Sequence, residues 1–336
     1  MKNADTAKYY KILSDEFPAW LNEYIQTKEL QTQKYISTTC GPIYTNLFDI
    51  KYFYSSLDHS IAVALIVWHF THDKKQTLAG LFHDISTPAF KHCVDFLNGD
   101  YMTQESTEDL TVDFIKKSKD VMKLLARDGI DISEIDNYHI YPIADNDTPK
   151  LSADRLEYSL ANALFAYDML SLDEIAEIYN DIEIQKNEFG EIELGFKTKA
   201  LARKFVQVTS KMSVIYRDDR TRFTMQFIAD VLKALHAEGV ITIEQLYDAK
   251  EADIIKIIES SKFKDQWAAW RKAKKVNVSK TAPQKVYFVH HPAKVRYIDP
   301  LCGGERISKI CKIAKNAIDK NLAYKMDNYV YLDFEL

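Results

Sequence analysis

An adjacent histidine and aspartate, His83 and Asp84, stand in an otherwise apolar stretch, residues 78–85. An ionised carboxylate is costly to bury unless it is paired, hydrogen-bonded or bound to a metal. Neighbouring residues on a helix point about 100° apart, so a ligand held between helices satisfies both side chains most readily. The pair therefore favours a divalent cation bound by neutral imidazole and carboxylate. A half-buried histidine beside a solvent-facing aspartate is the alternative interpretation.

Two further polar residues are expected beside apolar surface. His59 lies near the start of an almost wholly apolar helix expected over residues 57–70, and Asp154 lies in a long helix expected over residues 149–170. Taken alone, His59 is more typical of a hydrogen-bonded core histidine, and Asp154 of an exposed charged face. Together with the adjacent pair, they make four candidate metal ligands on three predicted helices.

A second histidine and aspartate follow the adjacent pair closely. His92 and Asp95 are three residues apart in a helix expected over residues 88–97, so they share one face. An aspartate in that position can orient the imidazole of the histidine. The spacing predicts that the two side chains can pair, and a surface pair is the alternative interpretation.

The composition is that of an ordinary globular protein: 336 residues, 46% hydrophobic and 28% charged. The net charge of −5 shows no excess of basic residues, so no obligate nucleic-acid partner is expected. No apolar run approaches the roughly 20 residues of a membrane span, and the first residues lack a signal-peptide core. The four cysteines form no metal or disulfide pattern. We therefore expect a cytoplasmic protein without a membrane partner.

The elements that position these residues are expected to be mainly α-helical, because glycine and proline are few and the apolar periodicity is helical over most of the chain. The pattern predicts a helical domain over residues 1–275, interrupted by a hairpin at 182–196. Residues 276–336 are predicted to form a small mixed α/β region docked on that body. Its strands are expected at 286–289, 294–298 and 329–332.

The order His59, then His83 and Asp84, then Asp154 resembles the HD-domain metal-dependent phosphohydrolases. The resemblance covers about residues 50–170 and is carried by residues 57–64, 79–85 and 153–158. Residues 88–95 and 294–300 resemble the branch that contains the deoxynucleotide triphosphohydrolases. The resemblance implies an HD-domain helical bundle with one divalent ion bound by the four candidate ligands. The ion is Mn, Fe, Co, Ni, Zn or Mg, and the sequence does not distinguish among them.

The resemblance also implies a function: hydrolysis of a nucleotide, a dNTP or a related phosphoester by metal-activated water. His92 and Asp95 are then the acid–base pair, and Gln104 and Glu105 are further catalytic candidates. Four residues are candidates for substrate contacts, namely Arg155, Tyr158, Lys294 and Arg296. A homo-oligomer is expected on the same basis.

Two positions depart from the pattern. Ser56 stands where the triphosphohydrolase branch often has an arginine, and Gln104 stands where the family often has a second catalytic histidine before a glutamate. An amide can position water or phosphate but cannot shuttle protons. Two alternatives therefore stay open: a hydrolase of nucleoside monophosphates, alarmones or cyclic nucleotides, and a nucleotide-sensing protein that lacks turnover.

Overall fold

The computed structural model describes residues 2–97 and 110–336, and it is mainly helical with small sheets. The α-helices are α1 (Ala7–Leu13), α2 (Ala19–Ile25), α3 (Lys28–Gln33), α4 (Ser56–Thr71), α5 (Lys74–Phe82), α6 (Cys93–Leu97), α7 (Thr111–Lys117), α8 (Lys119–Asp128), α9 (Ala153–Ala161), α10 (Leu172–Asn180), α11 (Lys199–Ile215), α12 (Asp219–Ala237), α13 (Ile243–Asp248), α14 (Glu251–Glu259), α15 (Lys264–Lys272), α16 (Ile307–Ile310) and α17 (Lys312–Leu322). A π-helix, η5 (Asn162–Ala166), continues α9.

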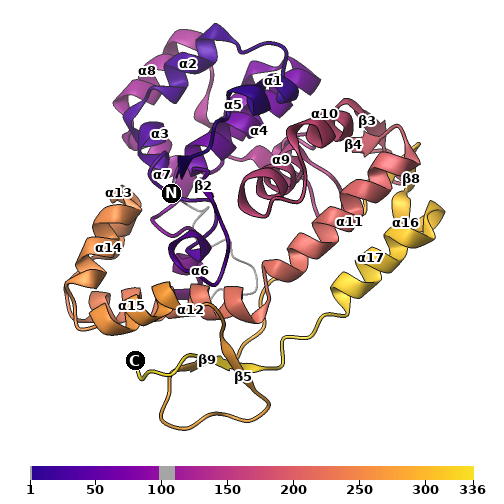
Figure 1. Ribbon diagram of the computed structural model, residues 1–336. Helices are drawn as coiled ribbons and strands as arrows, with labels where there is room; N and C mark the ends of the chain where they lie inside the picture. The colour runs from indigo at the N-terminus through magenta and orange to yellow at the C-terminus, as the bar shows by residue number, and fades with distance from the viewer. Residues whose placement is uncertain (1, 98–109) are drawn as a thin grey trace.

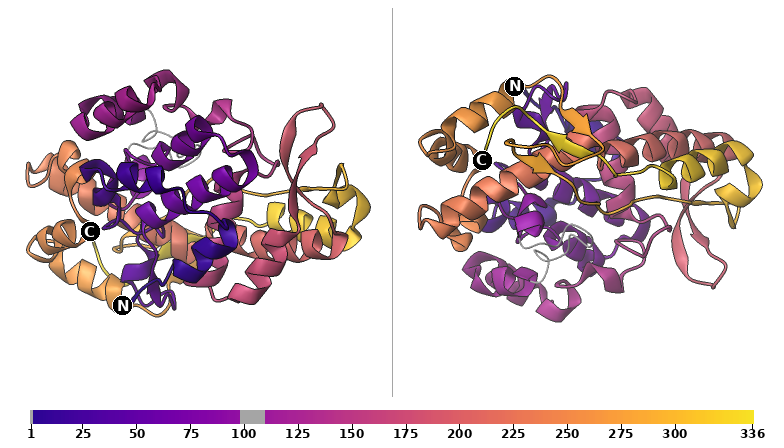
Figure 2. Two further views of the ribbon diagram at one scale, coloured as in Figure 1. Left: turned by 90° about the horizontal axis from the view of Figure 1, so that it is seen from above. Right: turned by 90° about the horizontal axis from the view of Figure 1, so that it is seen from below.

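The strands form three small sheets. They are β1 (Lys2–Asn3), β2 (Tyr52–Phe53), β3 (Ile182–Lys186), β4 (Ile192–Phe196), β5 (Asn277–Ser279), β6 (Phe288–Val289), β7 (Leu301–Cys302), β8 (Glu305–Arg306) and β9 (Tyr329–Tyr331). β1 pairs with β2, the second sheet has the order β3-β4-β7-β8, and the third has the order β5-β9-β6. The predicted hairpin at 182–196 is confirmed as β3 and β4, and it projects from the helical body in Figure 2.

Helix α4 is the central helix of the N-terminal half, and it packs against α5 and α9. It begins with a capping box, in which the Ser55 side chain accepts from the amide of Asp58 while the Asp58 carboxylate accepts from the amide of Ser55. An added Cβ at Gly80 of α5 would lie 3.3 Å from methyl groups of Val63 and Val67. The absence of a side chain at Gly80 therefore allows α5 to pack closely on α4, which brings the segment after α5 near the start of α4.

Three predicted helix boundaries are corrected by the structure. Helix α5 ends at Phe82, so His83 and Asp84 lie in the turn that follows it. The helix predicted over residues 88–97 starts only at Cys93, because Phe90 and Lys91 adopt positive φ values of 65° and 45°. The long helix expected over residues 149–170 is α9 followed by the π-helix η5.

Two clusters of buried apolar side chains form the core. The first joins α1, α4, α5, α9, α10 and α11, and the second joins α6, α12, α14 and α15. The C-terminal region contributes to both, since Ile307 and Ala314 pack in the first cluster and Val289 and Val330 in the second. The region after residue 276 therefore packs on the helical body, while the domain boundary itself stays a prediction.

One of the strands predicted for the C-terminal region does not form. Residues 294–298 have no strand structure, and the strands near 286–289 and 329–332 are short. The backbone carbonyl of Arg296 accepts hydrogen bonds from the side chains of Ser213 and Asn321 instead of a neighbouring strand. Side chains of α11 and α17 thus provide this backbone carbonyl with the hydrogen bonds that a neighbouring strand was expected to supply.

Among the residues that the structure describes, no helix is both long enough and apolar enough to cross a membrane. This agrees with the expectation from the sequence that no apolar run reaches the length of a membrane span.

Glu251, the first residue of α14, ties distant segments of the chain together. Its fully buried carboxylate accepts from the amides of Ser37 and Phe90, at 3.1 and 3.0 Å, and from the hydroxyl of Tyr44. Burial outweighs these hydrogen bonds and raises the pKa of Glu251 to about 7. The folded protein therefore holds a proton that the unfolded chain releases near pH 4.5.

We expect this carboxyl to make the protein less stable as pH rises from about 4.5 to about 7, because only the folded state stays protonated in that window. The expected contribution is about 3 kcal/mol across the window. Glu251→Gln is expected to flatten this slope when the free energy of unfolding is measured in urea at several pH values. Glu259→Gln, at a side chain of α14 that is 42% exposed, is the control. An unchanged slope in Glu251→Gln would contradict the assignment.

Candidate metal centre

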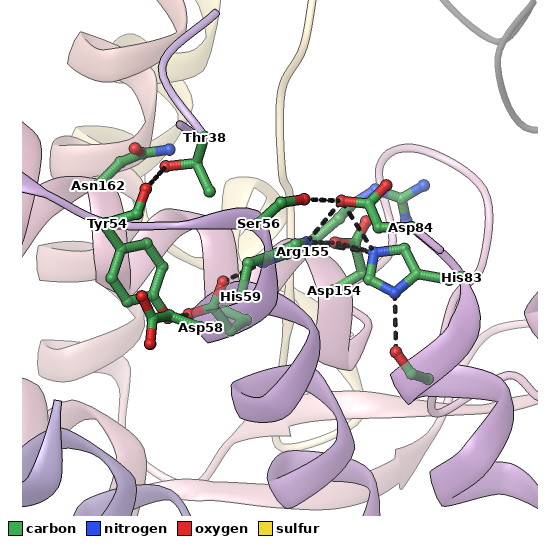
Figure 3. A network of polar contacts seen from close by, with 12 residues as sticks. Thr38, Tyr54, Ser56, Asp58, His59, His83, Asp84, Asp154, Arg155 and Asn162 are labelled. Carbon is green, nitrogen blue, oxygen red and sulfur yellow. Dashed lines mark hydrogen bonds and ion pairs between the residues drawn. The ribbon is translucent and has the colours of Figure 1, made fainter. Parts of the chain in front are cut away.

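Three separate segments bring the four candidate ligands together, as Figure 3 shows. His59 lies in the first turn of α4, His83 and Asp84 follow α5, and Asp154 lies in the first turn of α9. The Nε2 atom of His59 is 3.2 Å from both His83 Nε2 and Asp154 Oδ1. Ligand atoms of His59, His83 and Asp154 all lie within 4.8 Å of one another.

Asp84 lies beside this group. Its Oδ2 atom is 3.9 Å from His59 Nε2 and 3.8 Å from His83 Nε2. The side chains of Asp84 and Asp154 are 17% and 19% exposed, against 7% and 4% for those of His59 and His83. The centre is therefore reached by solvent from the side of the carboxylates.

The second nitrogen of each imidazole already has a partner. His83 Nδ1 is 2.7 Å from the carbonyl oxygen of Gly80, which can only accept a hydrogen bond, so His83 carries its proton on Nδ1. His59 Nδ1 donates in the same way to the carboxylate of Glu157. Each imidazole therefore presents its Nε2 atom to the other across 3.2 Å. A positive charge at that point, either a proton or a metal ion, makes the contact favourable.

A divalent cation fits this arrangement. Two nitrogens each about 2.1 Å from one ion lie about 3.0–3.4 Å apart for bond angles between 90° and tetrahedral. The donor set of two imidazoles and carboxylate oxygen suits first-row transition metals. The structure thus contains a candidate metal-binding group in His59, His83 and Asp154, with Asp84 adjacent to it.

The charges around the centre also favour a cation. Burial by itself disfavours an imidazolium, but the carboxylates of Glu157 and Asp154 outweigh it and raise the pKa of His59 to about 10. Burial likewise disfavours the ionised form of Asp154, and contact with His59 nevertheless lowers the pKa of Asp154 to about 2. In both cases the surroundings stabilise positive charge at the meeting point of the ligands.

Glu157 was not singled out from the sequence, although it lies on the same helix as Asp154 and three residues later. Its carboxylate is completely buried, contacts His59 Nδ1, and accepts from the hydroxyls of Tyr54 at 2.6 Å and Tyr9 at 3.2 Å. A carboxylate that holds the distal nitrogen of a metal-binding histidine fixes its tautomer and its orientation. The signal available in the sequence was the i, i+3 spacing from Asp154.

Glu157→Gln is expected to weaken metal binding about 10–100-fold, the usual size of such an effect. The hydroxyls of Tyr9 and Tyr54 need an acceptor and hold the amide oxygen on their side, so the amide nitrogen faces His59 Nδ1. That nitrogen cannot accept a hydrogen bond, so the ring is driven toward the tautomer with its proton on Nε2. Titration of the metal-free protein with Mn²⁺ measures this affinity. Glu177→Gln on α10, at a side chain that is 66% exposed, is the control. Equal affinities in the two variants would exclude the role of Glu157.

Asp84 has a second partner that the sequence analysis did not identify. Lys91 Nζ lies 2.6 Å from Asp84 Oδ2, and Lys91 is followed directly by His92. Lys91, followed by His83 and His59, holds the pKa of Asp84 well below its usual value, against the effect of burial. Asp84 is thus an ionised carboxylate shared between the candidate centre and an ammonium group.

The predicted acid–base residues are paired in the structure. His92 Nδ1 lies 2.8 Å from Asp95 Oδ2. The side chain of Asp95 is fully buried while that of His92 is 31% exposed, so the imidazole is held from inside the protein and its other edge faces outward. The two side chains are thus paired in the structure, and their catalytic role stays a prediction. Gln104 and Glu105 lie outside the described residues.

Three of the predicted substrate contacts lie near one another. Burial raises the pKa of Tyr158, and the nearby positive charges of Arg296 and Arg155 oppose that rise. Arg155 is anchored to a neighbouring loop, since its Nη1 donates to Asn146 Oδ1 at 2.6 Å and to the carbonyl of Lys150 at 3.1 Å. The roles of Arg155, Tyr158 and Arg296 in substrate binding stay predictions.

Lys294, the fourth predicted substrate contact, is partly buried two residues before Arg296. Its role stays a prediction.

A further histidine–aspartate pair was missed. His139 Nδ1 lies 2.8 Å from Asp145 Oδ2, and Asp145 also accepts from Ser152, the N-cap of α9. The ring of His139 packs on that of Tyr138, which in turn packs on His83. The six-residue spacing of His139 and Asp145 matches no helical or strand period, so the sequence offered no signal for this pair.

Comparisons with known proteins bear on the fold. No family model matches the chain. The uncharacterized protein YdhJ of Bacillus subtilis is 24% identical over 256 residues, which are 76% of this chain and 76% of YdhJ. The uncharacterized protein MG461 of Mycoplasma genitalium is 25% identical over 257 residues, 68% of this chain and 60% of MG461.

Among solved structures, a hypothetical protein from Aquifex aeolicus superimposes with a TM-score of 0.61 at 16% sequence identity. The match covers 95% of this chain and 93% of that protein. The similarity shows a shared overall fold. None of the three names states an activity, so the chemistry has to be argued from the site.

Proposed function

We propose that this chain is an HD-type metal-dependent phosphohydrolase that acts on a nucleotide, a dNTP or a related phosphoester. The observation that carries the proposal is the meeting of His59, His83 and Asp154, with the Nε2 atoms of both imidazoles 3.2 Å apart. These residues occur in the chain order that the HD-domain resemblance requires. Asp84 is the fourth proposed ligand.

A divalent ion at this centre would polarise a phosphoryl oxygen and lower the pKa of a water molecule. The residues of the chain would prepare the site for that chemistry. Glu157 holds one proton of His59 on Nδ1, so Nε2 is the atom that would bind the ion. Asp95 holds His92 Nδ1, so His92 Nε2 is left to exchange a proton with the leaving oxygen or the attacking water.

The surroundings of Tyr158 support a nucleotide as the substrate. The ring of Tyr158 lies 6.4 Å from that of Tyr216, and the charge of Arg296 acts on both residues. Aromatic side chains suit a sugar or base, and a guanidinium suits phosphate oxygens. Nucleoside monophosphates, alarmones and cyclic nucleotides share these groups and are the alternative substrates.

A nucleotide-sensing protein without turnover is the second candidate. The contact between Lys91 and Asp84 supports it, because an ammonium group already neutralises one of the four proposed ligands. Ser56 and Gln104, which depart from the family pattern, support it as well. A cytoplasmic location and a homo-oligomer remain predictions from composition and resemblance.

Elemental analysis of the purified protein, followed by a screen of phosphate esters with metal add-back, tests the proposal. Release of inorganic triphosphate from dNTPs supports a triphosphohydrolase, and release of orthophosphate supports one of the alternative substrates. Hydrolysis that is lost in Asp84→Ala excludes the sensor. Tight nucleotide binding with no turnover under any of the metals excludes the enzyme.

A further inference from the structure

Lys91 places a buried ammonium group at the edge of the candidate metal centre. Its Nζ atom lies 2.6 Å from Asp84 Oδ2 and 3.4 Å from the hydroxyl of Ser56, and its side chain is only 10% exposed. Ser56 Oγ lies 3.4 Å from the same oxygen of Asp84. The cationic group is thus held next to the place where the ligands meet.

The backbone around Lys91 is held in a conformation that its residues seldom adopt. Phe90 and Lys91 both lie in the left-handed region, with φ values of 65° and 45°. The amide of Phe90 donates to Glu251 at 3.0 Å, and that of Ala89 donates to the carbonyl of Leu246 at 2.7 Å. Such strain persists where surrounding contacts enforce it, and it is common at functional sites.

The ring of Phe90 anchors the same turn. It is fully buried and packs against Tyr44 and Trp267 in the second apolar cluster. The turn that carries Lys91 therefore belongs to the second cluster, whereas His59, His83 and Asp154 stand on elements of the first. Packing between the elements of the two apolar clusters therefore positions the ammonium group beside the candidate centre.

An ammonium group in this position has two physical consequences. It occupies the oxygen of Asp84 that faces the two imidazoles, and it repels a divalent cation at short range. Both effects weaken metal binding in the absence of an anion. An anion that contacts both Lys91 and the cation removes the repulsion, and the phosphoryl group of a substrate is such an anion.

We propose that Lys91 is a phosphate-binding residue of this centre, and that its contact with Asp84 makes metal and phosphate bind cooperatively. The inference rests on the proposed metal site and deepens it. Phosphate draws Lys91 from Asp84, which frees that carboxylate for the ion. Because such coupling is reciprocal, the metal must raise the affinity for phosphate by the same factor that phosphate raises the affinity for the metal.

The test uses Mn²⁺ and inorganic phosphate as probes, with calorimetric titration of the metal-free full chain. In wild type, saturating phosphate is expected to tighten Mn²⁺ binding about 10-fold, within the usual range for coupled sites. In Lys91→Met, we expect tighter Mn²⁺ binding without phosphate, phosphate binding to the Mn²⁺-loaded protein weakened about 10-fold, and the coupling lost. Lys91→Arg keeps the charge and is expected to keep phosphate binding. Lys256→Met, at an exposed position of α14, is the control.

The outcomes separate this inference from the proposed function. If wild type binds Mn²⁺ and Lys91→Met binds phosphate as well as wild type does, the role of Lys91 is excluded while the metal site stands. If folded wild type binds no Mn²⁺, both proposals fail. Should Lys91→Met prove unfolded by circular dichroism, Lys91→Gln decides the question. Phosphate binding and coupling equal to those of wild type in a folded glutamine variant overturn the inference, and loss of both supports it.

Discussion

His83→Ala and Asp154→Ala are each expected to abolish stoichiometric metal binding. Each substitution removes one of the three atoms that lie within 4.8 Å of one another, and two remaining ligands hold a divalent ion poorly. The purified protein is loaded by dialysis against buffer that contains the metal, and unbound metal is then removed. The metal content of the protein is measured by elemental analysis. Phosphohydrolase activity, where the screen finds one, is expected to disappear together with the metal.

Matched substitutions away from the centre control for damage to the fold. His236→Ala alters an exposed histidine of α12, and Asp173→Asn alters an acidic residue in the first turn of α10. Both are expected to bind metal as wild type does. Undiminished metal content in both His83→Ala and Asp154→Ala would contradict the ligand assignment, however well the atoms are placed.

His92→Ala is expected to behave in the opposite way, with full metal content and turnover slowed about 10²–10⁴-fold, the usual contribution of a general acid or base. His92 is hydrogen-bonded to Asp95 and is not one of the three candidate ligands, so its removal is expected to leave the candidate centre intact. Steady-state kinetics on the substrate found in the screen, beside metal analysis of the same samples, measure both effects.

Asp95→Asn serves as the companion to that variant. The amide keeps the volume of the buried side chain but no longer stabilises a protonated His92, so a smaller loss of turnover is expected than in His92→Ala. If His92→Ala loses its metal or keeps the wild-type rate, the acid–base role has to be withdrawn.

The mainly helical fold was predictable from the sequence because the apolar residues recur at helical spacing over most of the chain. The grouping of His59, His83 and Asp154 was predictable only when they were considered together, because ionisable groups beside apolar sequence need a partner and their order resembles that of a known family. The alternation of apolar residues over two short runs also predicted the hairpin at 182–196, because such alternation is typical of paired strands. These properties reside in consecutive residues.

The interior details were not predictable in this way. Glu157 contacts His59, Tyr9 and Tyr54, which lie 98, 148 and 103 residues away in the chain. In the sequence, Lys91 is one more charged residue on a predicted short helix. In the structure, the left-handed turn at residues 90 and 91 directs its side chain to Asp84. That turn depends on a hydrogen bond from Phe90 to Glu251, 161 residues later.

The sequence by itself determined which side chains can share a cation, since their chemical types and apolar flanks are local properties of the chain. Only the tertiary structure decided how they are used: which imidazole nitrogen carries the proton, and which carboxylate also faces an ammonium group. The physical reason is that tautomers, ion pairs and strained turns are set by partners that burial brings together. These partners lie far apart along the chain at intervals that match no helix or strand period, so the sequence pattern does not predict the contacts.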